Sequence, residues 1–147
     1  MRAVVTRVKN ASVEIEGKVN GQIGQGFLVL LGVAPGDTGD TAHKLAEKIC
    51  NLRVFEDENG KMNLNLGQVG GSILVVSQFT LFADTPSRRP GFTGAAQPDV
   101  AVPLHEAFLA RRRERGFRVE PGEFGESMRV ESVNEGPVTI LFDTEQK

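Results

Sequence analysis

The chain has 147 residues, of which 17 are Lys or Arg and 19 are Asp or Glu, giving a formal net charge of −2. A chain of this length fits a single domain, residues 1–147, that buries about two-thirds of the surface its unfolded form exposes. The charge balance argues against a protein that coats nucleic acid through a strong basic excess, and one cysteine with two histidines supplies neither an intrachain disulfide nor a zinc-type ligand set.

The N-terminal residues alternate apolar and polar side chains and lack the long apolar core of a signal peptide or a membrane span. We therefore expect a protein that stays in the reducing cytoplasm and does not associate with a membrane. We also expect it to use no metal and no cofactor.

The first part of the chain is typical of β-strands. Alternation with a period of two predicts half-buried strands at 2–8 and 12–16, and a tight turn at Gly17-Lys18 leads into a third strand at 19–23. Residues 27–33 are apolar on both faces, which indicates a central strand covered by another layer.

A helix is predicted next, with Thr38 or Asp40 as its cap. Apolar residues then recur at three- and four-residue steps and form one stripe: Ala42, Leu45, Ala46, Ile49 and Cys50. Because Cys50 falls on this stripe, we favour a packed core thiol over a nucleophile. A short strand at 53–55 follows and ends at a turn over 57–60.

The second half begins with an apolar run at 72–82, predicted to be a buried strand that ends at small polar groups. Residues 83–98 are rich in Pro, Gly, Ser, Thr and Arg without periodicity, which indicates a loop. A second helix is predicted from about Asp99 to Gly116. The side chains expected to face inward from it are Val102, Leu104, Ala107 and Phe108, together with the stem of Arg111.

Three further strands are predicted at 117–119, 128–133 and 138–142. Seven or eight strands with two helices indicate an α+β fold. We expect a compact, β-barrel-like or two-sheet core, largely antiparallel, with both helices packed on one side.

The strongest candidate for chemistry is Ser77-Gln78-Phe79-Thr80. No histidine lies in a motif that would activate Ser77 or Thr80, and the chain has no Gly-x-Ser-x-Gly elbow, so a conventional hydrolase triad is improbable. Main-chain N–H groups at a strand end are fixed in place, and uncharged Ser, Gln and Thr side chains add hydrogen bonds that suit a developing oxyanion. By itself, however, this pattern is more often an ordinary strand end.

Gly136-Pro137 also has two interpretations. It can be an ordinary turn between the strands at 128–133 and 138–142. With a cis peptide bond it would form a rigid wall, because Gly lets the backbone approach a ligand closely and Pro removes an N–H group. The sequence does not determine the isomer.

Arginines are concentrated in two segments despite the negative net charge. Arg88 and Arg89 lie in the predicted loop, and the second helix and the residues after it carry Arg111, Arg112, Arg113, Arg115 and Arg118. The second group is either a solvated helix face or a surface that holds an RNA end.

The two candidate segments together resemble the Ser-Gln-x-Thr and Gly-cis-Pro signatures of the D-aminoacyl-tRNA deacylase family. The similarity continues in 1–8, in 45–49 and in Lys61-Met62-Asn63-Leu64, and also in Phe124-Gly125 with Met128 four residues after Phe124. The resemblance thus extends over nearly the whole chain.

The resemblance implies an ester hydrolase that removes D-amino acids, and glycine mischarged on tRNA, from the acceptor end of tRNA while rejecting L-aminoacyl substrates. It implies a homodimer with active sites at the interface, in which Gly136-Pro137 of each subunit reaches the partner's site and excludes an L side chain. Main-chain N–H groups near Phe79 would hold the oxyanion, Ser77, Gln78 and Thr80 would shape the site, and the 2′-hydroxyl of the terminal adenosine would assist attack.

The resemblance also suggests roles for individual side chains. Thr80 would position the substrate, although it could be the nucleophile. Arg7 would tether the Gly-Pro segment, while Phe124 and Met128 would cradle the terminal adenine. One departure from the family pattern lies at 85–92, where Gly91 stands in place of Ser and the loop is shorter.

A non-catalytic RNA-binding module that uses the arginines of 111–118 is the alternative. It lacks an exposed aromatic run for base stacking, because Trp and Tyr are absent and most of the nine Phe lie in apolar runs. The sequence does not determine which D-amino acid or which tRNA is preferred.

Overall fold

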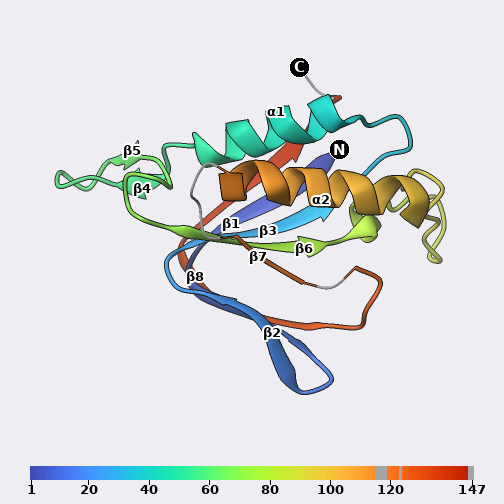
Figure 1. Cartoon of the computed structure of the whole chain (residues 1–147), viewed down its shortest axis with the longest axis horizontal. Helices are drawn as coiled ribbons and strands as arrows, with labels where there is room; N and C mark the ends of the chain where they lie inside the picture. Colours follow the sequence, from blue (N-terminus) through green and yellow to red (C-terminus); the bar gives the residue numbers. More distant parts are fainter. Residues whose placement is uncertain (115–118, 123, 146–147) are drawn as a thin grey trace.

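A computed structural model describes residues 1–114, 119–122 and 124–145. These residues form eight strands, two α-helices and a short 3-10 helix, η1 (Figure 1). In chain order the elements are β1 (Arg2–Ile15), β2 (Lys18–Ile23), β3 (Gly26–Gly32), α1 (Gly39–Cys50), β4 (Phe55–Glu56), β5 (Met62–Leu64), β6 (Ser72–Ser77), η1 (Phe79–Phe82), α2 (Pro98–Glu114), β7 (Val119–Pro121) and β8 (Arg129–Asp143).

The main sheet has the strand order β2-β1-β3-β6-β7, with β8 paired to β1, while β4 and β5 form a separate two-stranded sheet. β1 pairs antiparallel with β2, β3 and β8, whereas β6 runs parallel to both β3 and β7. The expectation of a largely antiparallel sheet is therefore wrong for its β3-β6-β7 part. Parallel neighbours require a crossover connection, and α1 and α2 lie in the two crossovers.

The two ends of the strand order approach each other, so the sheet is nearly closed into a barrel. The side-chain amide of Asn20 in β2 donates a hydrogen bond to the carbonyl oxygen of Pro121 in β7 at 3.2 Å. The two strands come this close because Gly21 has no side chain, since a Cβ there would lie 3.0 Å from the same oxygen. The predicted α+β class with a barrel-like core is confirmed.

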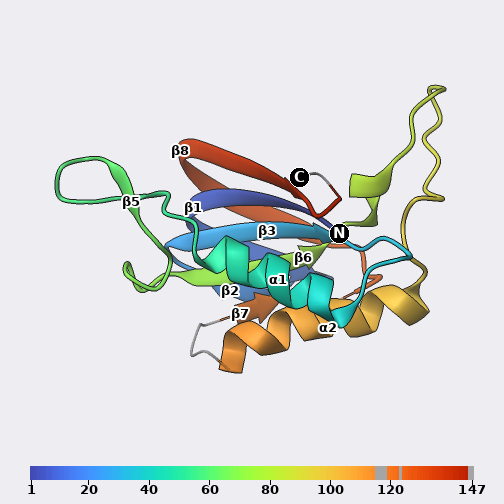
Figure 2. The same cartoon turned by 90° about the horizontal axis from the view of Figure 1, so that it is seen from above.

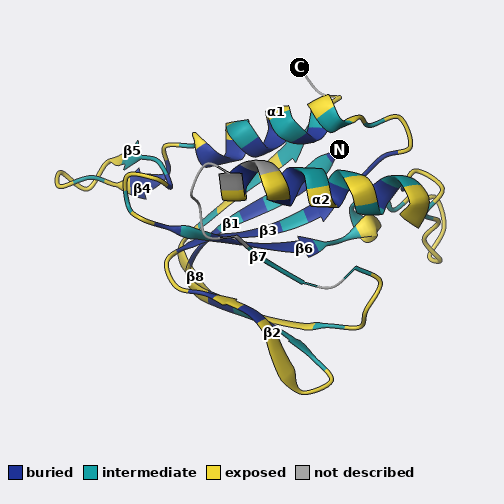
Figure 3. Ribbon diagram, in the orientation of Figure 1, coloured by how far each residue is buried: buried dark blue, intermediate teal, exposed yellow. Residues whose placement is uncertain are grey.

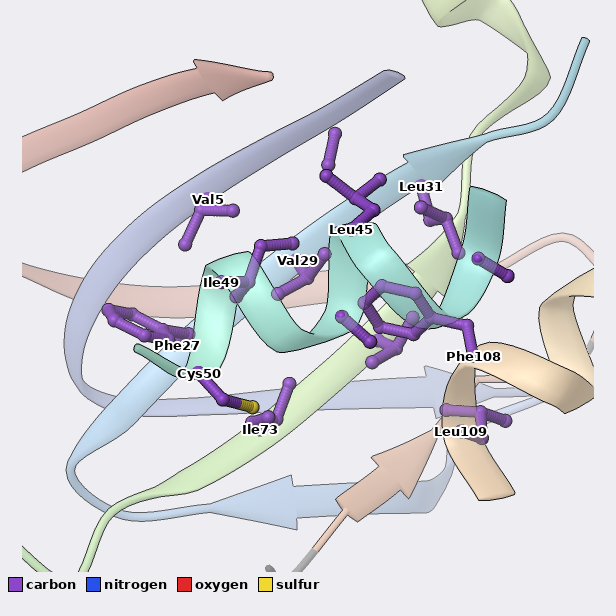
Figure 4. Packing of buried hydrophobic residues seen from close by; sticks show 14 of the residues in the cluster. Val5, Phe27, Val29, Leu31, Leu45, Ile49, Cys50, Ile73, Phe108 and Leu109 are labelled. Carbon is purple, nitrogen blue, oxygen red and sulfur yellow. The ribbon is translucent and has the colours of Figure 1, made fainter. Parts of the chain in front are cut away.

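Both helices cover one face of the sheet (Figure 1), as right-handed crossovers in a common direction require. The predicted stripe of α1 is buried: Ala42, Leu45, Ala46, Ile49 and Cys50. It packs on the inward side chains of β1, β3 and β6 and on Phe108 and Leu109 of α2 (Figure 4). Cys50 is a core thiol, as expected from its place on the stripe. Thr38 caps α1, its hydroxyl accepting a hydrogen bond from the Thr41 N–H.

The opposite face of the sheet has its own apolar cluster inside the barrel. Residues of β1, β2, β3 and β6 contribute to it: Val8, Ala11, Val13, Ile23, Leu28, Leu74 and Val76. The buried interior and the exposed outer edge of β8 contrast clearly in Figure 3. No helix in the described part of the chain meets the length and hydropathy needed to span a membrane.

Several predicted element boundaries are wrong. The strands expected at 2–8 and 12–16 are one continuous strand, β1, because β8 pairs along its whole length. The run 72–82 stops being a strand at Ser77 and continues as η1. The strand expected at 53–55 is β4, Phe55–Glu56, and the first hairpin turns at Glu16-Gly17 rather than Gly17-Lys18.

The second helix and the strands after it also differ from the prediction. Phe108 is buried as expected, but Val102, Leu104 and Ala107 are only half-buried, and Ala101, His105 and Leu109 fill the interior. The predicted stop at Gly116 and residues 117–118 of the predicted strand at 117–119 lie outside the described residues. The described chain resumes at Val119, the first residue of β7. The last two predicted strands form a single strand, β8, because both halves pair with β1.

Arg112 joins the two helices. Its side chain is 1% exposed and donates a hydrogen bond to a carboxylate oxygen of Glu47 in α1 at 2.8 Å. Arg112 therefore belongs neither to a solvated helix face nor to an RNA-binding surface, and its role is to brace α2 against α1.

This brace gives a stability prediction. We expect Arg112→Ala to lower the free energy of unfolding by about 2–4 kcal/mol, because it removes a buried guanidinium and takes from Glu47 its buried charge partner. The control is Lys44→Ala, which breaks the exposed Lys44–Asp40 pair and should cost less than about 0.5 kcal/mol. Urea unfolding followed by circular dichroism measures both, and equal losses would contradict the brace.

Candidate active site

The end of β6 redirects the chain at the predicted catalytic tetrapeptide. Ser77 is the last residue of the strand, and the Gln78 N–H donates a hydrogen bond to the Leu31 carbonyl at 2.8 Å. The chain then tightens into η1, where Leu81 N–H bonds the Gln78 carbonyl at 3.2 Å. Within the described part of the chain, the N–H groups of Phe79 and Thr80 have no protein acceptor. The first N–H groups of a helical turn lack partners inside it, which leaves them available to a ligand.

Phe79 lines a hollow of about 260 Å³, and Thr80 follows it directly in the chain. One wall is formed by the end of β6 and the start of η1, and the other by the segment that leads into β8 with the first residues of that strand. The lining residues are Val76, Ser77, Gln78, Phe79, Phe124, Gly125, Glu126, Met128 and Val130. The structure thus brings together Ser77, Gln78 and Phe79 with Phe124 and Met128, which are separated by more than forty positions in the sequence.

Thr80 contacts the site through Gln78. The Gln78 side-chain amide donates a hydrogen bond to the Thr80 hydroxyl at 2.6 Å. An amide N–H cannot take up the hydroxyl proton, so this contact orients Thr80 without activating it as a nucleophile.

Phe124 is backed by His105. The ring of His105 in α2 packs edge-on against Phe124, with ring centroids 6.3 Å apart. Burial lowers the pKa of His105 below its usual value, against a smaller opposing effect of Glu106. His105 is therefore neutral at pH 7 and acts here as a packing residue.

The position of η1 is set by Arg2, which sequence analysis did not single out. Its guanidinium donates hydrogen bonds to the Leu81 carbonyl at 2.9 Å and to the Asp143 carboxylate at 3.0 Å, and it lies 4.6 Å from the centre of the Phe82 ring. The pKa of Asp143 is lowered mainly by a hydrogen bond from the Glu145 N–H and to a smaller extent by the contact with Arg2. Arg2 thus ties η1 to the end of β8.

Gly136-Pro137 lies elsewhere, within β8, and its peptide bond is cis. The Arg7 guanidinium donates one hydrogen bond to the Glu135 carbonyl at 2.9 Å and another to the Val54 carbonyl at 2.6 Å. Arg7 is itself buried. A separate hollow of about 320 Å³ lies here, with Arg7, Glu135 and Gly136 in its lining.

The two signatures do not meet within one chain. Arg7, which holds the residue before Gly136, pairs with Phe27 of β3, and Phe27 pairs with Ile73 of β6. Ser77 lies four residues farther along β6, and at about 3.3 Å per residue the two signatures are about 13 Å apart along the strand.

Comparison with known proteins identifies the family. The model of the D-Tyr-tRNA(Tyr) deacylase family matches residues 4–143. The chain belongs to this family. The D-aminoacyl-tRNA deacylase of Thermus aquaticus is 56% identical over 148 residues, which cover 100% of this chain and 97% of that protein. The resemblance inferred from the sequence is thus confirmed, and with it the assignment to the D-aminoacyl-tRNA deacylases.

Solved structures agree with this fold. The structure described as the c-Myc DNA Unwinding Element Binding Protein has a TM-score of 0.90 and 39% identity, covering 98% of this chain and 99% of its own. A probable eukaryotic D-amino acid tRNA deacylase has a TM-score of 0.83 over 96% of this chain and 97% of its own, and at 18% identity this likeness supports the fold alone.

Sequence reasoning missed one charged residue that lines the candidate site of this D-aminoacyl-tRNA deacylase. Among the described residues that line the 260 Å³ hollow, Glu126 is the only one with an ionisable side chain. Its position between Phe124 and Met128, both singled out from the sequence, was the available signal.

The Gly-Pro segment gives a test of local geometry. Gly136 has φ +129°, and a Cβ there would lie 2.9 Å from an Arg7 guanidinium nitrogen and 2.9 Å from the Val138 side chain. We expect Gly136→Ala to lower the free energy of unfolding by about 1–3 kcal/mol, because an L side chain strains this backbone. The control is Gly24→Ala, which has nothing within 4 Å and should change stability by less than about 0.5 kcal/mol. Chemical denaturation measures the free energy of unfolding of both variants. An unchanged stability of Gly136→Ala would contradict the close approach of Arg7 and Val138 to Gly136.

Proposed function

We propose that this protein, as a D-aminoacyl-tRNA deacylase, hydrolyses the ester that joins a D-amino acid to the terminal adenosine of tRNA. The observation that carries this proposal is the hollow at the end of β6, lined by Ser77, Gln78 and Phe79, where the N–H groups of Phe79 and the adjacent Thr80 have no protein acceptor among the described residues. The products are free tRNA and a free amino acid. The protein would act in the cytoplasm, where tRNA is charged.

In this proposal, the rate of ester hydrolysis depends on orienting the substrate and stabilising the oxyanion. An aminoacyl ester is already a good electrophile, so the protein needs mainly to orient it and to stabilise the developing charge. Water attacks the carbonyl carbon, and the N–H groups of Phe79 and Thr80 hold the resulting oxyanion. The bond from carbon to the ribose oxygen then breaks, and the proton from water passes to that oxygen. The neighbouring 2′-hydroxyl of the adenosine assists this transfer.

The other residues of the hollow place the substrate. Phe124 and Met128 present apolar surface suited to the terminal adenine. The Gln78 side chain holds the Thr80 hydroxyl in a hydrogen bond. Thr80 therefore positions the substrate and does not attack its ester carbonyl. Glu126 adds a negative charge that attracts the α-ammonium group of the aminoacyl ester.

Chirality is sensed by a wall that a second subunit contributes. The 13 Å between the two signatures within one chain is too far for Gly136-Pro137 to line its own hollow, so we infer that the dipeptide of one protomer reaches the hollow of its partner. With the amino group and ester fixed, an L side chain would collide with the main chain of the wall, whereas a D side chain or the hydrogen of glycine would not. Because main chain discriminates, many D-amino acids should be accepted.

The edge of β8 supports a homodimer. β8 pairs only with β1 in the described ranges and leaves its other edge open. Val133 and Leu141 on this strand are 49% and 77% exposed. An open edge with exposed apolar side chains is a surface that proteins usually cover.

The central prediction concerns stereochemistry. We expect the protein to release the amino acid from D-tyrosyl-tRNA and from glycyl-tRNA while L-tyrosyl-tRNA survives, because only the L side chain meets the wall. Acid-precipitable radioactivity over time measures the three reactions. Equal survival of all three substrates would refute the enzyme assignment.

A second prediction separates the two roles of Thr80. We expect Thr80→Ala to retain activity within about tenfold of the wild-type kcat on D-tyrosyl-tRNA, because the hydroxyl only positions the substrate. Loss of a covalent nucleophile would instead lower kcat by about 10³-fold or more. A loss of that size in a variant with an unchanged circular dichroism spectrum would establish Thr80 as the nucleophile.

A further inference from the structure

Residues 84–91 form a projecting arm, which Figure 2 shows rising away from the sheet and the helices between η1 and α2. Asp84 and Gly91 close its base by exchanging two main-chain hydrogen bonds, each of 2.8 Å. Every residue from Asp84 to Gly91 is exposed. The arm is therefore ordered at its base and open to solvent along its length.

The base of the arm is fixed to the candidate active site. Asp84 follows the end of η1 by two residues. Directly after the arm, the Phe92 ring packs edge-on against the Phe79 ring, with centroids 5.1 Å apart and planes at 76°. Phe79 is one wall of the hollow. The base of the arm is thus attached to a residue that lines the hollow.

The tip of the arm carries a local positive charge. Arg88 and Arg89 are adjacent there, and Asp84 is the only acidic residue between positions 83 and 98. Neither arginine has an ion-pair partner in the part of the chain that the structure describes. The Ser87 hydroxyl donates a hydrogen bond to the Arg89 carbonyl at 3.1 Å, and Pro86 and Pro90 restrict the backbone on either side.

We propose that this arm binds the phosphodiester backbone of the tRNA 3′ strand just before the terminal adenosine, an inference that rests on the proposed function. With the ester held in the hollow, the strand leaves it toward solvent, and the base of the arm packs on the exposed Phe79 of the lining. Arginine is the side chain best suited to phosphate, because its planar guanidinium donates paired hydrogen bonds and keeps its charge. Contacts of this kind carry no base information, so the arm adds affinity for RNA without selecting a sequence.

Binding of a fluorescent RNA hairpin with a single-stranded 3′ end tests the arm without any chemistry. We expect Arg88→Ala/Arg89→Ala to weaken binding roughly tenfold and to make the slope of log K against log salt shallower by about 1–2. Arg88→Lys/Arg89→Lys keeps both charges and should restore most of the affinity. The control Lys44→Ala/Lys48→Ala removes two cations from α1 and should bind as the wild type does.

Kinetics then link the arm to the substrate. We expect the double alanine variant to lose roughly tenfold in kcat/KM on D-aminoacyl-tRNA but nothing on the small ester D-aminoacyl-adenosine, which lacks the phosphates. Unchanged RNA binding, or equal losses on both substrates, would overturn the proposal. If the wild type binds RNA through the arm but hydrolyses neither substrate, the proposed function is wrong, whereas the proposal that the arm binds RNA is supported.

Discussion

The parallel pairing of β6 with β3 determines where the candidate active site lies. Residues 26–31 of β3 run beside 72–77 of β6, and the Gln78 N–H adds one more hydrogen bond to Leu31 before the chain leaves the sheet. Two helical crossovers produce this arrangement and place both helices on one face. Both helices cover the core, and the chain after β6 continues into η1. Among the described residues, the first N–H groups of η1 have no protein acceptor and are free to bind a ligand.

Arginines act as internal braces at three points of the structure. Arg2 holds η1, Arg7 holds the carbonyl of Glu135, and Arg112 joins the helices. Each presents several donors in a rigid fork, which lets one side chain fix two distant segments. Arg88 and Arg89 differ from these, since they lie on an exposed arm without an ion-pair partner in the described residues. In a chain with a net charge of −2, this contrast supports the arm as our proposed contact with an anionic strand.

The separation of the two signatures explains why one subunit is an incomplete enzyme in our proposal. Four residues of extended strand separate the level of Gly136, at Ile73, from the end of β6 at Ser77, and an extended strand cannot bend back on itself. Two-fold symmetry resolves this, because a patch that reaches a partner's hollow is reached by the partner in return. Each dimer would then contain two complete sites, and the wall would be rigid because Arg7 supports it from within its own subunit.

Local patterns in the sequence determined the apolar stripe of α1, the buried run that becomes β6, the α+β class and the family signatures. These depend on residues close in the chain, whose spacing reflects the period of a helix or a strand. Only the tertiary structure decided that β1 is one strand, that β6 has parallel neighbours and that Phe124 and Met128 face Ser77 across one hollow. Those outcomes depend on pairing between segments that are distant in sequence. Such pairing is selected by the packing of the whole core, which no local pattern encodes.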